Sequence, residues 1–148
     1  MTEFNEVNAE ISPDGRFLAY QSDESGREEV YVRPFPNVEE GVWQVSRDGG
    51  TRPLWARNGR ELFYMTSEGQ LVAVPFQTNP AIAIGNAEVV VDGAYFTGAP
   101  GRTYDVSPDG QRFLMMKEEG ASDGTSEAEL IFVLNWGEEL KRLVPTRD

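Results

Sequence analysis

The side chains that could do chemistry in this sequence are almost all carboxylates. The chain has 25 acidic residues and neither histidine nor cysteine. It therefore cannot build a Ser-His-Asp triad, a histidine-liganded zinc site or a thiolate nucleophile. Phosphate-binding P-loop and G-x-G-x-x-G patterns are also absent. Two kinds of site remain: a pair of carboxylates acting as acid and base, and an oxygen-liganded Ca²⁺ site.

No motif favours either of these two sites. The Asp-x-Asp-x-Asp-Gly pattern of a calcium loop is missing, and 25 acids form close pairs by chance. Asp14 and Asp109 each lie in a Ser-Pro-Asp-Gly sequence, which is typical of a turn. Arg16 and Arg60 follow such turns, and we expect them to pair with nearby carboxylates. The sequence thus indicates no catalytic, cofactor-binding or metal-binding residue.

The charge balance excludes some classes of partner. The formal net charge of −12 repels nucleic acid and anionic membrane surfaces, and such an excess commonly serves solubility. No segment is long and apolar enough to span a bilayer. The first residues, 1–6, lack the features of a signal peptide. As given, the chain is expected to stay in the cytoplasm; as part of a longer exported or membrane-anchored protein, it would act outside it.

One turn-and-strand unit occurs three times and organises the chain. Its copies are centred on Gly15, Gly59 and Gly110, which are 44 and 51 residues apart. Proline and aspartate before the glycine preset a type I turn, and the glycine supplies a positive φ. Repeat periods of roughly 40–50 residues are typical of propellers and related arrays.

Short apolar segments surround each turn and predict antiparallel strands. Leu18, Leu62 and Phe113 occupy matching positions in the second strand of each unit, and these strands are expected to be buried on both faces. Third strands are predicted at 30–35, 71–76 and 131–136, and fourth strands at 42–46 and 88–91. The third unit has no fourth strand of its own.

The end of the chain departs from the repeat. A polar loop is predicted from Glu118 to Glu129, between the second and third strands of the last unit. Residues 136–144 have the capping, charge and apolar pattern of one short helix, which Pro145 ends. The chain is predicted to be a single all-β repeat domain over residues 1–148, with its three repeat units at about 7–50, 51–98 and 102–136.

The turn, the Val30-Tyr31-Val32 strand and the Ser46 to Gly50 turn together resemble the TolB-like β-propeller repeats of bacteria. The ending from Leu134 to Pro145 is similar to the close of propeller domains fused to bacterial serine/threonine protein kinases. The resemblance implies three antiparallel four-stranded blades, half of a six-bladed propeller, with a role in protein interaction or sensing. It carries over no catalytic residue.

Three blades leave two apolar blade faces without a neighbour. We therefore expect two copies to form a homodimer that completes a six-bladed ring, with Phe4 and Trp136 at the junction. Residues 2–6 would supply the missing fourth strand there. The expected function is non-enzymatic binding of a protein or small ligand, without a cofactor. A carboxylate-dependent hydrolase or isomerase on the same scaffold remains the alternative.

Overall fold

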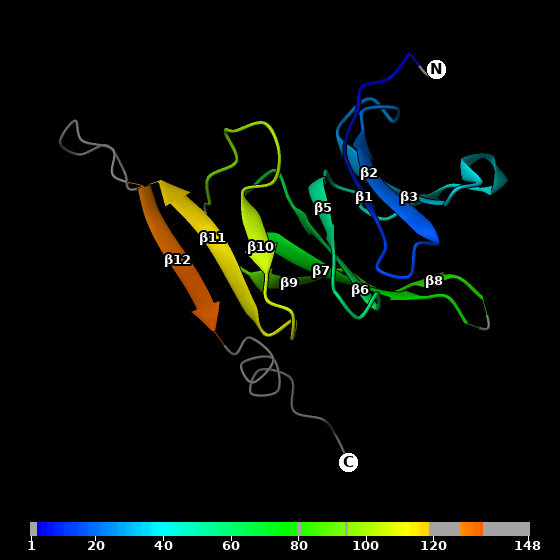
Figure 1. Cartoon of the computed structure of the whole chain (residues 1–148). Coiled ribbons are helices and arrows are strands. Elements are labelled where there is room, and N and C mark those ends of the chain that lie inside the picture. Colours follow the sequence, from blue (N-terminus) through cyan, green and yellow to red (C-terminus); the bar gives the residue numbers. More distant parts are fainter. Residues whose placement is uncertain (1–2, 80, 94, 119–127, 135–148) are drawn as a thin grey trace.

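Three antiparallel sheets lie side by side in chain order (Figure 1) in a computed structural model that describes residues 3–79, 81–93, 95–118 and 128–134. The first sheet contains β1 (Glu6–Ile11), β2 (Phe17–Ser22), β3 (Glu29–Pro34) and β4 (Trp43–Gln44), with a 3-10 turn, η1 (Val38–Glu40), before β4. The second contains β5 (Thr51–Trp55), β6 (Glu61–Met65), β7 (Leu71–Gln77), β8 (Ala83–Ile84) and β9 (Glu88–Val91). The third contains β10 (Tyr104–Val106), β11 (Arg112–Glu118) and β12 (Ala128–Leu134).

The repeated turns connect the first and second strands of each sheet. Gly15, Gly59 and Gly110 have φ values of 73°, 67° and 70°, a region that side chains with a Cβ rarely occupy. Each glycine N–H donates to the carbonyl three residues earlier, at 2.8, 2.9 and 2.9 Å. The Ser12 hydroxyl donates to Asp14 and accepts from the Phe17 N–H. The serine and aspartate thus hold the turn closed, as their residue types predict.

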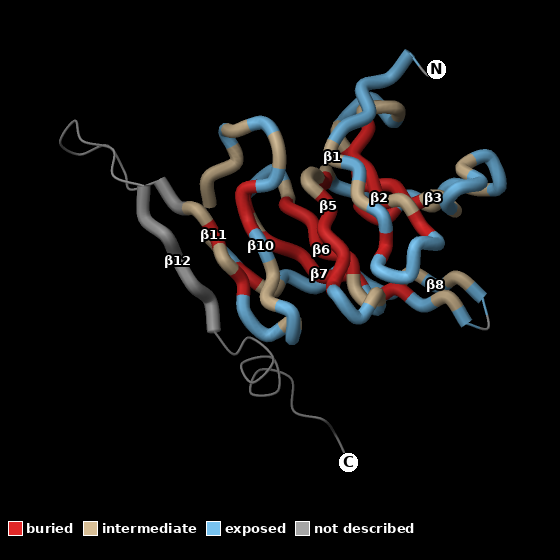
Figure 2. Tube along the Cα trace, in the orientation of Figure 1, coloured by how far each residue is buried: buried red, intermediate tan, exposed pale blue. Residues whose placement is uncertain are grey.

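Two apolar interfaces join the sheets. Residues of β2 and β3 pack against Trp55, Leu62 and Tyr64 of the second sheet. The alternate residues of β6, Phe63 and Met65, pack against the third sheet. The middle sheet is therefore buried on both faces, as Figure 2 shows for β5, β6 and β7. Ring contacts at about 5 Å cross both interfaces, Phe17 with Phe76 and Phe63 with Phe113, and Trp55 contacts Phe76 within the middle sheet.

The prediction that every second strand is buried on both faces holds for β6 and, apart from Leu18, for β2. In β2 and β11, Leu18, Leu114 and Met116 remain partly exposed. The reason is position in the array: the middle sheet has two neighbours, and each outer sheet has one. The sequence shows which faces of a strand are apolar. It does not show which of those faces an adjacent sheet covers.

Other boundaries also differ from the predictions. β4 is shorter than residues 42–46, and the second sheet gains β8, which was not predicted. The polar loop predicted from Glu118 to Glu129 is too long, because β11 and β12 pair as far as Glu118 and Ala128. A ladder is held by backbone hydrogen bonds, so polar residues can continue it. The third sheet has three strands in the part that the structure describes, and the predicted helix at 136–144 lies outside that part.

Candidate functional site

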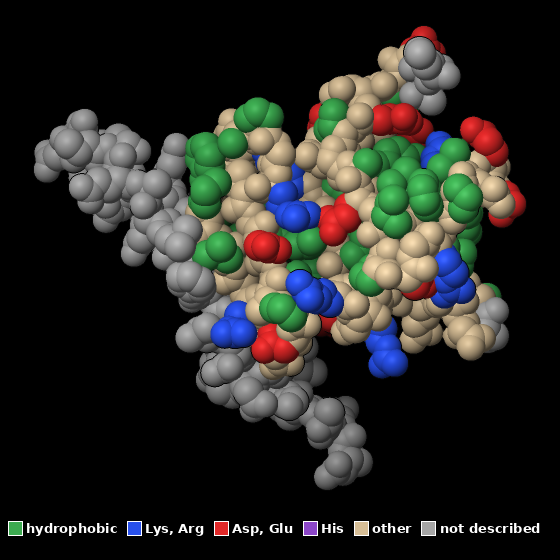
Figure 3. Space-filling model, in the orientation of Figure 1, with side chains coloured by type: hydrophobic (Ala, Val, Ile, Leu, Met, Phe, Trp, Pro, Cys, Tyr) green, Lys and Arg blue, Asp and Glu red, His purple; other side chains and the backbone are tan. Residues whose placement is uncertain are grey.

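Within the described part of the chain, no sheet packs against the outer face of the first sheet, which carries apolar side chains beside charged ones. Ile11 is 48% exposed and pairs with Leu18 on this face. A groove of about 520 Å³ crosses it, lined by Ala9, Leu18, Tyr20, Arg33 and Val38 with two glutamates. Figure 3 shows hydrophobic side chains gathered over this sheet. Stacking of Tyr20 on Tyr31, and the hydrogen bond from Arg33 Nε to Tyr20 Oη at 2.7 Å, shape the groove floor.

The third sheet has a similar outer face. Phe113 and Met115 point into the interface with the second sheet, so Leu114 and Met116 point away from it. Leu114 lines a shallow groove of about 330 Å³ with Val106, Pro108 and Arg112. Both ends of the array of sheets therefore present apolar residues.

A row of charged and polar side chains follows the first strands of the three sheets. Arg102 Nη1 donates to Glu10 Oε2 at 2.6 Å, across 92 residues of sequence. Gln21 Oε1 accepts from Asn8 Nδ2 and from the Arg52 N–H, both at 3.0 Å. Figure 3 shows acidic and basic side chains together across the middle of this face. These contacts tie the inner strands of the three sheets to one another.

Arg52 is fixed by the loop before β10. It has a positive φ of 56° at an irregularity in β5, and Asn8 has the same conformation at the matching place in β1. The Arg52 guanidinium donates to the carbonyls of Thr97, Ala99 and Gly101. Its hydrogen-bonding capacity is used for holding the loop.

Burial raises the pKa of two carboxyl groups. The pKa of Glu10 is raised mainly by desolvation, and Arg102 opposes this shift. The pKa of Glu61 is raised by desolvation and by the nearby charge of Glu88. An acid and base pair needs one raised and one ordinary carboxyl at a common cleft. Because Arg102 pairs directly with Glu10, that carboxylate is occupied, and Glu61 does not line the grooves described above.

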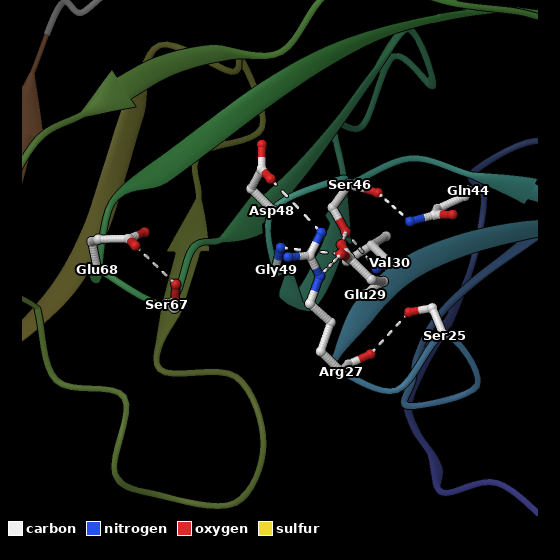
Figure 4. A network of polar contacts seen from close by, with 10 residues as sticks. All are labelled: Ser25, Arg27, Glu29, Val30, Gln44, Ser46, Asp48, Gly49, Ser67 and Glu68. Atoms are coloured by element: carbon white, nitrogen blue, oxygen red, sulfur yellow. Dashed lines mark hydrogen bonds and ion pairs between the residues drawn. The ribbon is translucent and has the colours of Figure 1, made fainter.

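A buried carboxylate anchors the end of the first sheet (Figure 4). Glu29 is fully buried; it pairs with Arg27 Nε at 2.6 Å and accepts from Ser46 Oγ and from the Gly49 N–H. Ser46 Oγ also accepts from the Val30 N–H at 2.8 Å. The partners of Glu29 and Ser46 in this network all belong to the same blade. The network therefore attaches the turn at Ser46 to Gly50 to the start of β3. Sequence reasoning identified that turn but not its partner, Glu29.

Comparison with solved structures identifies the architecture. An oligogalacturonate lyase from Vibrio parahaemolyticus superposes with a TM-score of 0.61 at 15% identity, over 84% of this chain and 35% of that one. TolB from Acinetobacter baumannii gives 0.61 at 14% identity, over 91% and 31%. An oligogalacturonate lyase in complex with manganese gives 0.63 at 15% identity, over 84% and 35%. No protein-family description and no curated protein matches the sequence.

The fold is that of a TolB-like β-propeller. We number the three sheets blades 1, 2 and 3 in chain order, and the chain spans about a third of the length of the structures just named. The likeness, at these identities, concerns the fold alone. The predicted all-β class and the TolB-like architecture are confirmed.

The two residues predicted for a dimer junction fall in different situations. Phe4 precedes β1 and is 43% exposed, whereas Trp136 lies outside the described residues. Within the described ranges, no group of three or more acidic side chains is placed to hold a metal ion. No helix in the same ranges has the length and hydropathy to cross a membrane.

Proposed function

We propose that this chain is a non-enzymatic binding module that works as half of a six-bladed propeller, with a second copy completing the ring. The observation that supports this most directly is the pair of outer faces, one on blade 1 and one on blade 3, that carry exposed apolar residues and that no other described sheet covers. Propellers close with about 4–8 blades, and contiguous apolar surface is unusual on a soluble monomer. A two-fold dimer would cover both faces with identical junctions.

The repeat indicates how the junction would pack. The residue three after the turn glycine points to the preceding blade: Leu62 packs on blade 1, and Phe113 on blade 2. The residue four after it points to the following blade, as Ala19 and Phe63 do. By the same rule, Leu18 on blade 1 needs a preceding blade, and Leu114 on blade 3 needs a following one. A second copy supplies both.

The binding surface of such a ring would be the central face. In a closed ring, the first strand of each blade lines the channel, so the row that includes Asn8, Glu10 and Arg102 would surround its mouth. Polar groups that converge on a concavity are the usual basis of specificity for a small ligand or a peptide. The binding partner is thus proposed to contact this row.

The alternative function is a carboxylate-dependent enzyme. One observation favours it: two of the similar structures are named as lyases. Glu10, with its raised pKa, would be the acid of such a site. Its ion pair with Arg102 at 2.6 Å and the absence of histidine favour the binding module instead.

Directed cross-linking tests the ring. The chain has no cysteine, so Leu18→Cys and Leu114→Cys can be introduced together and treated with a short bis-maleimide. The ring predicts a covalent dimer from the double variant, because residue 18 of one copy lies against residue 114 of the other. Each single variant should stay uncross-linked.

The single variants are the matched controls. A dimer formed through two blade 1 faces would cross-link Leu18→Cys alone, and this result would contradict the proposal. The absence of a covalent dimer from the folded double variant would contradict it as well. Thermal unfolding of all three variants checks that the substitutions leave the blades intact.

A further inference from the structure

The turn of blade 2 differs in charge from the turns of blades 1 and 3. Blades 1 and 3 have Ser-Pro-Asp-Gly, whereas blade 2 has Ala56-Arg57-Asn58-Gly59. The backbone is the same in all three, with the glycine N–H bonded to the first residue's carbonyl at 2.8 to 2.9 Å. The Asn58 side chain accepts from the Arg60 N–H at 2.8 Å, as Asp14 does from the Arg16 N–H. The turn therefore keeps its shape, while an acid is lost and a cation is gained.

This exchange leaves two arginines without counter-charges. In blade 1, Arg16 pairs with Asp14 at 2.7 Å; in blade 3, Arg112 pairs with Asp109 at 3.6 Å. The ion pair predicted for Arg60 is not found among the described residues, and Asn58 stands where the other turns have aspartate. Among the described residues, the guanidinium groups of Arg57 and Arg60 take part in no ion pair or hydrogen bond, and both residues are exposed. Arg47 is likewise unpaired among the described residues, but only Arg57 and Arg60 lie together at one turn.

Both arginines line a groove between blades 1 and 2. Its volume is about 650 Å³, within the usual range for small-molecule sites of roughly 300–1,000 Å³. Phe17, Trp55 and Phe76 form its apolar floor, and the amides of Asn58, Gln77 and Asn79 are among its polar lining. Basic side chains lie along the lower edge in Figure 3, at the level of these turns.

The charged side chains that line the groove, together with Arg16 beside it, sum to a formal charge of +2. Asp14 also lines it, but Arg16 neutralises that carboxylate, and the Arg16 guanidinium is fixed further by Thr78 at 3.0 Å. Arg57 and Arg60 remain. Guanidinium groups bind carboxylates and phosphates through paired N–H donors. A small ligand with two negative charges matches this groove.

We propose that the groove between blades 1 and 2 binds a small organic dicarboxylate, with one carboxylate on each of Arg57 and Arg60. Its carbon skeleton would lie along the aromatic floor. In a dicarboxylate, each carboxylate can reach one arginine. A compact phosphate dianion would place both charges at one point of a groove whose wall includes the carboxylate of Asp14. The site belongs to one chain and goes beyond the ring, so it is tested independently of dimer formation.

Calorimetric titration of the full chain with glutarate, and in parallel with a sugar phosphate, tests the site. Glutarate should bind, and replacing both arginines through Arg57→Gln and Arg60→Gln should weaken binding at least about a hundredfold, since a hydrogen bond to a charged group contributes about 1.5–3 kcal/mol. A second variant, Arg57→Pro with Asn58→Asp, gives blade 2 the Pro-Asp-Gly of the turns in blades 1 and 3, with Ala56 in place of their serine. It should fold and also lose binding.

Arg47→Gln is the matched control, because Arg47 is exposed and lies in a different groove. It should leave the affinity within about twofold, as expected for a charge outside the site. Absence of glutarate binding overturns the proposal. So does tighter binding of the sugar phosphate, or an equal loss of affinity in Arg47→Gln.

Discussion

Glu29 shows how one residue attaches two segments of a blade. Its carboxylate is fully buried, and it is stabilised by Arg27, Ser46 and the Gly49 N–H. The sequence predicted the turn at Ser46 to Gly50 from its glycines. It could not predict Glu29 as the partner, because the two are 17 residues apart and meet only when β3 and β4 are adjacent.

Replacing Glu29 by alanine should destabilise the fold strongly. Removing the buried carboxylate takes the acceptor away from the Ser46 hydroxyl and the Gly49 N–H, and a buried polar group left unpaired typically costs about 1–3 kcal/mol; Arg27 is 55% exposed and returns to solvent. Urea unfolding should show this loss for Glu29→Ala. Glu39→Ala, at an exposed site in η1, should change stability by at most about 0.5 kcal/mol. Similar small losses in both variants would show that the network contributes little.

Glu10 gives a prediction for pH dependence. Its pKa is raised in the folded chain from an ordinary value of 4.5, so the protonated form favours folding. This contribution is fully present below pH 4.5 and is lost as pH rises through the folded-state pKa. Arg102→Ala removes the charge that opposes the shift, so the pKa of Glu10 should rise further. Carboxyl-carbon NMR titration of both proteins measures this, and a lower pKa in the variant would contradict the assignment.

At the scale of elements, the position of a strand in the array decides its burial. Leu62 in β6 and Leu18 in β2 are equivalent in the repeat, yet Leu62 is fully buried and Leu18 is partly exposed. The repeated turn predicted the two strands of each hairpin. It could not predict β8, because two residues, Ala83 and Ile84, carry no periodicity and pair only with the end of β7.

The two equivalent leucines should therefore respond differently to alanine substitution. Leu62→Ala should cost about 2–5 kcal/mol, as cavities in a packed core do, at every protein concentration. Leu18→Ala should cost less, and its effect should shrink on dilution, because only the dimer covers this face. Thermal unfolding over a range of concentrations provides the comparison. Equal losses that do not depend on concentration would mean that the face of blade 1 is not a junction.

At the scale of the whole molecule, the three blades lie side by side in chain order. The sequence predicted this from the repeat number, and the likeness to TolB-like propellers agrees with it. The sequence shows that the blade 2 turn has Arg57 and Asn58 in place of proline and aspartate. It does not show that this turn lines a groove between blades 1 and 2. Spatial neighbours of this kind require the assembled fold.

The native mass in solution tests the central claim most directly. Light scattering after size exclusion, at micromolar concentration, should give 33.0 kDa, which is twice the chain mass of 16.5 kDa. The mass should stay constant across the peak, because a closed two-fold ring leaves no free face for further copies. A single well-behaved species of 16.5 kDa at the same concentration would contradict the ring.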